Sequence, residues 1–262
     1  MDMDNKVLLQ VEGSIATVTL NRPEVLNALD SDMWAGLEKA ALSITSTPEV
    51  NVVILTGAGE KAFSPGLDVK AYVASGLPTA GRRHRNSVDT ISNMARIFTL
   101  YEDLAVPVIA AINGYCFGGG LELALCCDIR LAAEHAVFAL PEVNIGTIPD
   151  MGGTQRLPKV IGAGYTKELA YTARKIDAAE ALRIGLVNHV YPKEQLMAEA
   201  RKLATEIAQK HPATVQAAKK AINAGILRGL REGIAYETAL AVYSVALAGK
   251  PSAEAAGLKK EK

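Results

Sequence analysis

The sequence predicts an α/β protein in which helices alternate with strands of a parallel sheet. Two short apolar runs, residues 52–56 and 108–112, end at Gly57 and at Asn113-Gly114. Their continuous hydrophobicity is typical of strands that are buried on both faces of a parallel sheet. Helical patterns alternate with strands along the chain, and this alternation defines the α/β class.

The first elements along the chain are predicted to be a β-hairpin and a helix. Residues 6–11 and 15–20 are rich in β-forming residues, and Glu12-Gly13-Ser14 between them is typical of a hairpin turn. After a break at Asn21-Arg22-Pro23, apolar residues recur at helical spacing as far as Pro48. The apolar positions of this expected helix are Met33, Leu37, Ala41 and Ile44.

Shorter strands are expected at residues 128–132 and 137–139. Further on, Asp177-x-x-Glu180 has the spacing of a capping box and predicts the start of a helix. Residues Leu186 to Val190 are expected to form a strand after that helix.

The pattern changes at about residue 194 to consecutive amphipathic helices. One apolar stripe runs through Leu196, Ala200, Leu203 and Ile207, and another through Val215, Ala218, Ile222 and Ile226. Pro212 separates them, and a third helix is expected after Gly233. We therefore divide the chain into a core, residues 1–193, and a C-terminal helical region, residues 194–262, which we expect to pack on the core or on a neighbouring subunit.

Composition excludes several classes of protein. The 28 Lys and Arg residues balance 28 Asp and Glu residues, so the total charge predicts no nucleic-acid partner. No apolar stretch approaches the ~20 residues that cross a bilayer, and Met1-Asp2-Met3-Asp4 does not resemble a signal peptide. We expect a soluble cytoplasmic protein without a membrane partner. The three cysteines, Cys116, Cys126 and Cys127, predict reduced thiols and no metal site.

One glycine loop formally matches a dinucleotide-binding fingerprint. Residues 57–62 have the pattern G-x-G-x-x-A after a strand, and Arg82 and Arg83 follow at a spacing suited to a phosphate of NADP. Phe63-Ser64-Pro65-Gly66 would break the helix that should begin on this loop. A plain turn, or another kind of backbone site, is therefore the favoured interpretation.

A second loop, Gly114-Tyr115-Cys116-Phe117-Gly118, resembles a nucleophile elbow with cysteine in the serine position. Asp150 and His189 follow in the order of a hydrolase triad. Against this interpretation, the glycine run 118–120 extends the turn further than an elbow requires, and a cysteine among apolar residues is commonly a small buried side chain.

The glycine run 118–120 is followed by Leu121-Glu122-Leu123, which begins a helix. Three glycines let the backbone approach a ligand closely, and the start of a helix offers unpaired N–H groups and a partial positive charge. The sequence therefore predicts an oxyanion hole here, in which one donor is typically worth about 10²–10³ in rate.

Several motifs together resemble the crotonase (enoyl-CoA hydratase/isomerase) family over nearly the whole chain. They are Asn21-Arg22-Pro23, Leu26-Asn27-Ala28-Leu29, and residues 62–70, 112–124, 141–146 and 152–157. The resemblance implies a ββα spiral core with a C-terminal helical region, assembled as a homotrimer or homohexamer. It also implies an acyl-CoA substrate, and because coenzyme A is part of that substrate, no cofactor is expected.

The resemblance assigns roles to particular residues. The thioester oxygen would be bound by the backbone amides of Leu67 and Gly119, and Leu67, Asp68, Val69 and Lys70 would border the CoA. Glu122 and Glu142 would be the acid/base pair of a hydratase. Two close carboxylates favour a state in which one is ionised and the other is protonated, and such a pair can add water across a double bond.

Asp150 departs from the hydratase pattern, in which glycine is more common. Pro149-Asp150-Met151-Gly152 is a good turn sequence, so Asp150 could be a turn residue. Alternatively, Asp150 resembles the aspartate that dienoyl-CoA isomerases pair with the second glutamate, here Glu142. The isomerisation of a 3,5-dienoyl-CoA is therefore the first alternative to hydration, although those isomerases usually have aspartate at the position of Glu122.

A second alternative is a non-catalytic protein of this fold that binds RNA through Arg82-Arg83-His84-Arg85. The neutral total charge disfavours it, and such a basic cluster is usually a solvated surface. Lys219 and Lys220 are likewise expected to be surface charges.

Overall fold

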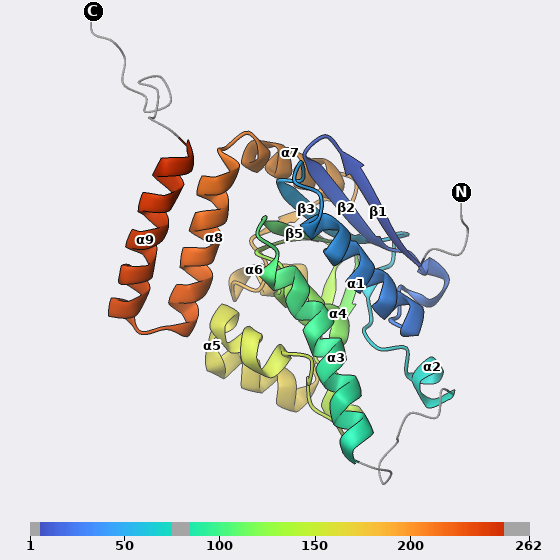
Figure 1. The fold of residues 1–262 in the computed structure, drawn as a ribbon. Helices are drawn as coiled ribbons and strands as arrows, with labels where there is room; N and C mark the ends of the chain where they lie inside the picture. Colours follow the sequence, from blue (N-terminus) through green and yellow to red (C-terminus); the bar gives the residue numbers. More distant parts are fainter. Residues whose placement is uncertain (1–5, 75–83, 249–262) are drawn as a thin grey trace, which may run out of the picture.

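The computed structural model describes residues 6–74 and 84–248, which form two sheets surrounded by helices (Figure 1). The larger sheet has six strands in the order β1-β2-β3-β5-β7-β10, and the smaller has four in the order β4-β6-β8-β9. The strands of the larger sheet are β1 (Val7–Glu12), β2 (Ile15–Leu20), β3 (Val52–Gly57), β5 (Val108–Ile112), β7 (Ile129–Ala133) and β10 (His189–Tyr191). Those of the smaller sheet are β4 (Ala62–Ser64), β6 (Tyr115–Phe117), β8 (Val137–Ala139) and β9 (Ile176–Asp177).

The pairing within the sheets confirms the predicted hairpin and the predicted parallel strands. β1 pairs antiparallel with β2, whereas the pairs β2–β3, β3–β5, β5–β7 and β7–β10 are all parallel. In the smaller sheet β4, β6 and β8 are parallel and β9 is antiparallel to β8. The α/β class is therefore confirmed.

The two sheets arise from a repeated connection. Each of β3, β5 and β7 in the larger sheet is followed by a short strand of the smaller sheet, β4, β6 and β8 respectively. At the second of these crossings the Asn113 side chain donates hydrogen bonds to the carbonyl oxygens of Gly57 (2.8 Å) and Gly59 (2.9 Å). It thus ties two successive repeats together where the chain leaves the larger sheet.

Both faces of the larger sheet are covered. On one face Val53 and Leu55 belong to a core that includes residues of α1 (Ser31–Thr45) and α3 (His84–Asp103). On the other face Val52 and Ile54 pack with residues of α7 (Leu196–Ala208), which include Ala200. Alternate residues of one strand thus enter two different cores, as expected for a buried parallel strand.

The remaining helical elements surround the smaller sheet or follow the core. They are η1 (Pro23–Val25), α2 (Val69–Ala74), α4 (Gly119–Leu125), η2 (Glu142–Ile145), α5 (Gly153–Thr172), α6 (Ala178–Arg183), α8 (Pro212–Leu227) and α9 (Leu230–Ala248). In Figure 1, α8 and α9 form an antiparallel pair at one side of the molecule. The third predicted C-terminal helix begins before Gly233, because Gly233 already donates to the carbonyl of Gly229 in its first turn (2.9 Å).

The expectation that Lys219 is a surface charge is wrong. Its side chain is buried, its Nζ lies 2.8 Å from Asp128 Oδ2, and it donates to the carbonyl of Val106 at 3.0 Å. These contacts attach α8 to the chain segments that directly precede β5 and β7. Lys220, the next residue, is exposed as expected.

The strand predicted at 186–190 begins only at His189. The N–H groups of Leu186 and Val187 donate to the carbonyl of Ala181, at 2.8 and 3.3 Å, and so complete the end of α6. Because these donors are used by the helix end, they are not available to a strand ladder. The start of α6 is as predicted, since the Asp177 side chain accepts from the Glu180 N–H at 2.8 Å.

None of the helices in residues 6–74 and 84–248 combines the length with the apolar character that a membrane crossing requires.

Candidate active site

The backbone nitrogens of Leu67 and Gly119 lie near one another, shortly after the ends of β4 and β6. Leu67 forms a parallel bridge with Leu29 in which Leu29 donates to Gly66 O (2.8 Å) and Asp68 donates to Leu29 O (3.0 Å). This bridge uses the groups of residues 66 and 68, so the N–H of Leu67 itself points away from Leu29. A Cβ atom on Gly119 would lie 3.7 Å from the Leu67 nitrogen, and one on Gly66 would lie 2.7 Å from the Gly119 nitrogen.

A buried polar network holds the loop that carries Leu67. Asn27 is fully buried in a left-handed conformation (φ 64°), and its Nδ2 donates to the carbonyls of Ala58 (3.0 Å) and Ala62 (2.9 Å). Its own carbonyl accepts from Ser64 Oγ at 2.9 Å, and Ser64 Oγ in turn accepts from the Gly66 N–H at 3.1 Å. The position of the Leu67 amide is thus fixed by contacts that lie away from the site.

The glycine run packs closely against other parts of the protein. Gly118 has φ 50°, and a Cβ atom there would lie 2.8 Å from Glu142 Oε1. A Cβ atom on Gly120 would overlap the carbonyl of Ser64. The run therefore allows β4 and Glu142 to pack directly against the start of α4.

Glu122 lies in the first turn of α4 and is fully buried. Its Oε1 accepts hydrogen bonds from the backbone N–H groups of Met151 (2.9 Å) and Gly153 (2.8 Å), whereas its Oε2 is buried without a partner in the described structure. Burial raises the pKa of Glu122 to about 7, and the charges of Glu142 and Asp150 raise it as well. The two amide donors act in the opposite direction because they stabilise the carboxylate.

Glu142 begins η2 and is 8% exposed. Its Oε2 is also buried without a partner among the described residues. Burial raises the pKa of Glu142 to about 7, with a further contribution from Asp150. The structure therefore brings Glu122 and Glu142 together, each with one carboxylate oxygen that the protein leaves free to bind something else.

Asp150 lies in the turn between η2 and α5, so the predicted turn is present. It is also close enough to raise the pKa of both glutamates. Burial raises the pKa of Asp150 itself. Asp150 is therefore both a turn residue and a neighbour of the two glutamates.

The residues expected to border CoA differ in their hydrogen bonds and in their exposure. Asp68 accepts from Arg22 Nη1 at 3.1 Å and from the Ala71 N–H at 3.0 Å, and its pKa is lowered, chiefly by the Ala71 hydrogen bond. Val69 and Lys70 are exposed at the start of α2. The contacts of Asp68 hold the loop, whereas Val69 and Lys70 present their side chains at the surface.

Two alternative sites are not supported by the structure. The loop after Gly57 leads into strand β4 and not into a helix, so it lacks the helix start of a dinucleotide site, and Arg82 and Arg83 lie outside the described residues. Cys116 is fully buried in the core, and burial raises the pKa of its thiol well above the usual range. Cys116 is therefore a core residue and not an exposed nucleophile.

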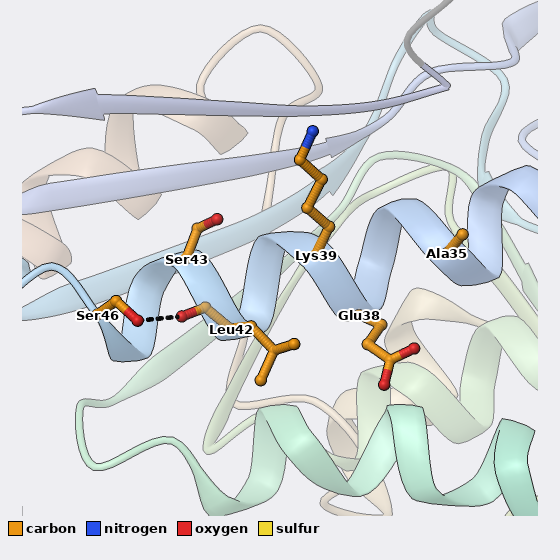
Figure 2. Close-up of a pocket in the computed structure, with 6 residues that line it drawn as sticks. All are labelled: Ala35, Glu38, Lys39, Leu42, Ser43 and Ser46. Carbon is orange, nitrogen blue, oxygen red and sulfur yellow. Dashed lines mark hydrogen bonds between the residues drawn. The ribbon is translucent and has the colours of Figure 1, made fainter.

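Two hollows on the surface are lined by residues other than Glu122, Glu142 and Asp150. Figure 2 shows a shallow hollow along the outer face of α1, where Ser46 Oγ donates to the carbonyl of Leu42 at 3.0 Å. A more polar hollow lies between β1–β3 and the start of α7, and Lys193 and Arg201 are among its lining residues. In the part of the chain that the structure describes, no group of three His, Cys, Asp or Glu residues could hold a metal ion.

Arg156 and Asn27 lie in motifs that carry the resemblance, but no pattern in the sequence indicates a role for either residue. Arg156 donates to the carbonyl of Met151 at 3.2 Å, next to the amides that bind Glu122. Arg156 also donates to Thr99 and Glu102 of α3, and no spacing along the chain signals these contacts, because they depend on how α5 packs against α3.

The chain is similar to known proteins over most of its length. Residues 10–252 match the family model described as "Enoyl-CoA hydratase/isomerase", and the chain belongs to this family, the crotonase superfamily. It is 42% identical over 234 residues to "Short-chain-enoyl-CoA hydratase" of Clostridium acetobutylicum, covering 89% of this chain and 87% of the relative. It is 39% identical over 231 residues to "Crotonyl-CoA hydratase" of Syntrophomonas wolfei, covering 88% and 86%.

Among solved structures, the fold resembles that of an enoyl-CoA hydratase from Bacillus anthracis. The TM-score is 0.85 at 39% identity, over 94% of this chain and 92% of that one. The expected crotonase-like core is therefore confirmed.

Proposed function

We propose that the protein is an enoyl-CoA hydratase that adds water to a short-chain 2-enoyl-CoA thioester. The observation that carries the proposal is the pair of unpartnered buried oxygens, Glu122 Oε2 and Glu142 Oε2, beside the convergent amides of Leu67 and Gly119. The names of the C. acetobutylicum and S. wolfei relatives support the reaction and the short acyl chain.

In the proposed reaction a water molecule lies between the two free carboxylate oxygens. The ionised carboxylate takes one proton from this water, and the resulting hydroxide forms a bond to C3 of the enoyl group. The electron pair of the double bond moves toward the thioester, whose oxygen becomes an enolate oxygen bound by the Leu67 and Gly119 amides. The protonated carboxyl group then gives its proton to C2, which completes the addition of water.

The pKa values suit this division of roles. Because burial raises the pKa of both Glu122 and Glu142 to about 7, the pair holds about one shared proton near neutral pH. One carboxylate and one carboxylic acid are then available in the same site. Coenzyme A is part of the substrate, and the proposed reaction uses no other cofactor.

We further propose that the chain works as a homotrimer or homohexamer. Apolar side chains are exposed along the C-terminal helix pair, at Ile222, Ile226, Leu230, Ile234, Val242 and Val245 among others. A large exposed apolar surface is typical of a protein interface.

Isomerisation of a 3,5-dienoyl-CoA is the second candidate, because Asp150 lies within electrostatic range of Glu142. Replacing Asp150 by Asn separates the two functions. We expect hydration of crotonyl-CoA to survive in Asp150→Asn, with a pH profile moved to lower pH, since removal of a like charge lowers the pKa of both glutamates. The test is to incubate wild type and Asp150→Asn with crotonyl-CoA and with a 3,5-dienoyl-CoA and to identify the products.

The hydratase proposal fails if the wild-type protein converts the dienoyl-CoA but not crotonyl-CoA and if Asp150→Asn loses that conversion. A protein without catalytic activity would convert neither thioester.

A further inference from the structure

Arg156, on α5, contacts the turn that binds Glu122. The N–H groups of Met151 and Gly153 donate to Glu122 Oε1, and the carbonyl of the same Met151 accepts from Arg156 Nη1 at 3.2 Å. The residue between the two donors is Gly152, which has φ 114°. A Cβ atom on Gly152 would overlap Arg156 Nη1, so the guanidinium packs directly on the backbone of this turn.

The other side of the guanidinium is bound to α3. Nε and Nη2 both donate to Glu102 Oε2, at 2.9 and 2.6 Å, and Nη2 also donates to Thr99 Oγ1 at 2.9 Å. The Arg156 side chain is only 14% exposed. The planar group is therefore fixed by three acceptors on two elements, and these contacts fix the turn relative to α3.

We propose that Arg156 is a positioning residue for the acid/base pair, which holds the Met151–Gly153 turn so that its two amides point at Glu122. The proposal rests on the proposed function, because it assigns Arg156 a part in placing one of the two reacting carboxyl groups. Among the described residues, Arg156 makes no hydrogen bond to Glu122, whose Oε2 has no partner.

Lysine could not replace arginine in this role. A guanidinium has several N–H donors in one rigid plane, whereas an ammonium group is a compact charge on a flexible stem. Lysine would keep the positive charge near Glu122, but it could not hold Met151 O, Glu102 and Thr99 together. Arg156→Met removes both the geometry and the charge, whereas Arg156→Lys removes only the geometry. Comparing the two variants therefore separates the two effects.

The pKa of Glu122 reports on this arrangement. The titratable groups that face Glu122 are Glu142 from η2, Asp150 from the turn, Arg156 from α5 and Cys126 from α4. If the turn relaxes, Glu122 loses donors that stabilise its carboxylate, so its pKa rises. The limb of the pH profile that belongs to Glu122 then moves to higher pH.

The experiment measures crotonyl-CoA hydration against pH for wild type, Arg156→Met, Arg156→Lys and Thr99→Val. We expect kcat to fall about 10–100-fold in Arg156→Met, with KM changed much less, because a small displacement of a catalytic group has effects of this size. We expect one pH limb to move upward by about one unit. Arg156→Lys should show most of the loss, and Thr99→Val, which removes one acceptor, a smaller shift in the same direction.

The matched control is Arg96→Met, which removes another arginine–carboxylate pair of α3, the one with Glu38 of α1. It should leave kcat and both pH limbs unchanged. If Arg156→Met is too unstable to measure, the kinetics and pH profiles of Arg156→Lys and Thr99→Val still test the positioning role. Wild-type kinetics and pH limbs in Arg156→Lys, or in a folded Arg156→Met, would overturn the proposal.

A second measurement separates failure of this proposal from failure of the proposed function. The carboxyl pKa of Glu122 can be followed by NMR in protein with ¹³C-labelled glutamate, with Glu122→Gln to assign the signal. Absence of hydration by wild type would refute the hydratase function, whereas an unchanged Glu122 titration in the Arg156 variants would refute the positioning role.

Discussion

Replacement of Glu122 or Glu142 by glutamine should lower the kcat for crotonyl-CoA hydration by about 10³-fold, within the range known for general acid–base groups. Glutamine keeps the shape of the side chain but can neither accept nor deliver the proton. In Glu122→Gln the side-chain amide oxygen could still accept from the N–H groups of Met151 and Gly153, so the turn and the binding of acyl-CoA should be preserved.

The measurement is steady-state kinetics together with calorimetric binding of a saturated acyl-CoA. Glu49→Gln, at an exposed glutamate before β3, is the control and should behave as wild type. The double variant Glu122→Gln/Glu142→Gln should be little worse than either single variant, because residues that act as a unit are not additive. Wild-type turnover in both single variants would refute the acid/base pair.

The second large effect is expected from Gly66→Ala. The new methyl group would lie 2.7 Å from the Gly119 nitrogen and 3.1 Å from the Phe117 carbonyl oxygen. It would therefore block or displace one of the two amides proposed to bind the thioester oxygen. We expect kcat/KM for crotonyl-CoA to fall by about 10²–10³, the typical loss for one oxyanion donor.

Gly13→Ala is the matched control, because Gly13 also has a left-handed backbone (φ 60°) but nothing lies within 4 Å of its Cβ position. It should cost about 1–2 kcal/mol of stability from backbone strain alone and leave kcat/KM unchanged. Thermal unfolding of both variants shows whether Gly66→Ala is folded. Full activity in a folded Gly66→Ala would contradict the role of the Gly119 amide.

The larger elements could be predicted because their patterns depend on residues that are close together in the sequence. The turn at Gly13 fixes the first hairpin, and the continuous apolar residues of β3 and β5 identify buried parallel strands. The three-residue strands β4 and β6 are too short to have a period, so only their partners define them. Most of α3 carries polar residues, and its fully buried residues Ile97, Phe98 and Tyr101 lie near its end.

The same distinction applies to the site. Glu122, Glu142 and the glycine run could be singled out from the sequence because they lie in compact motifs. The unpartnered oxygens of the two glutamates and the contacts of Arg156 with Thr99 and Glu102 depend on packing between elements far apart in the chain. Lys219 illustrates the same limit, since only the folded chain brings it to Asp128.

The central claim is that two main-chain amides bind the thioester oxygen beside the two glutamates. A crystal structure of the protein with an unreactive acyl-CoA thioester tests it most directly. The account predicts a thioester oxygen about 2.7–3.1 Å from the nitrogens of both Leu67 and Gly119, with C3 of the acyl chain facing Glu122 and Glu142. A thioester oxygen bound elsewhere, or an acyl chain that leaves the two carboxyl groups out of reach of C2 and C3, would contradict it.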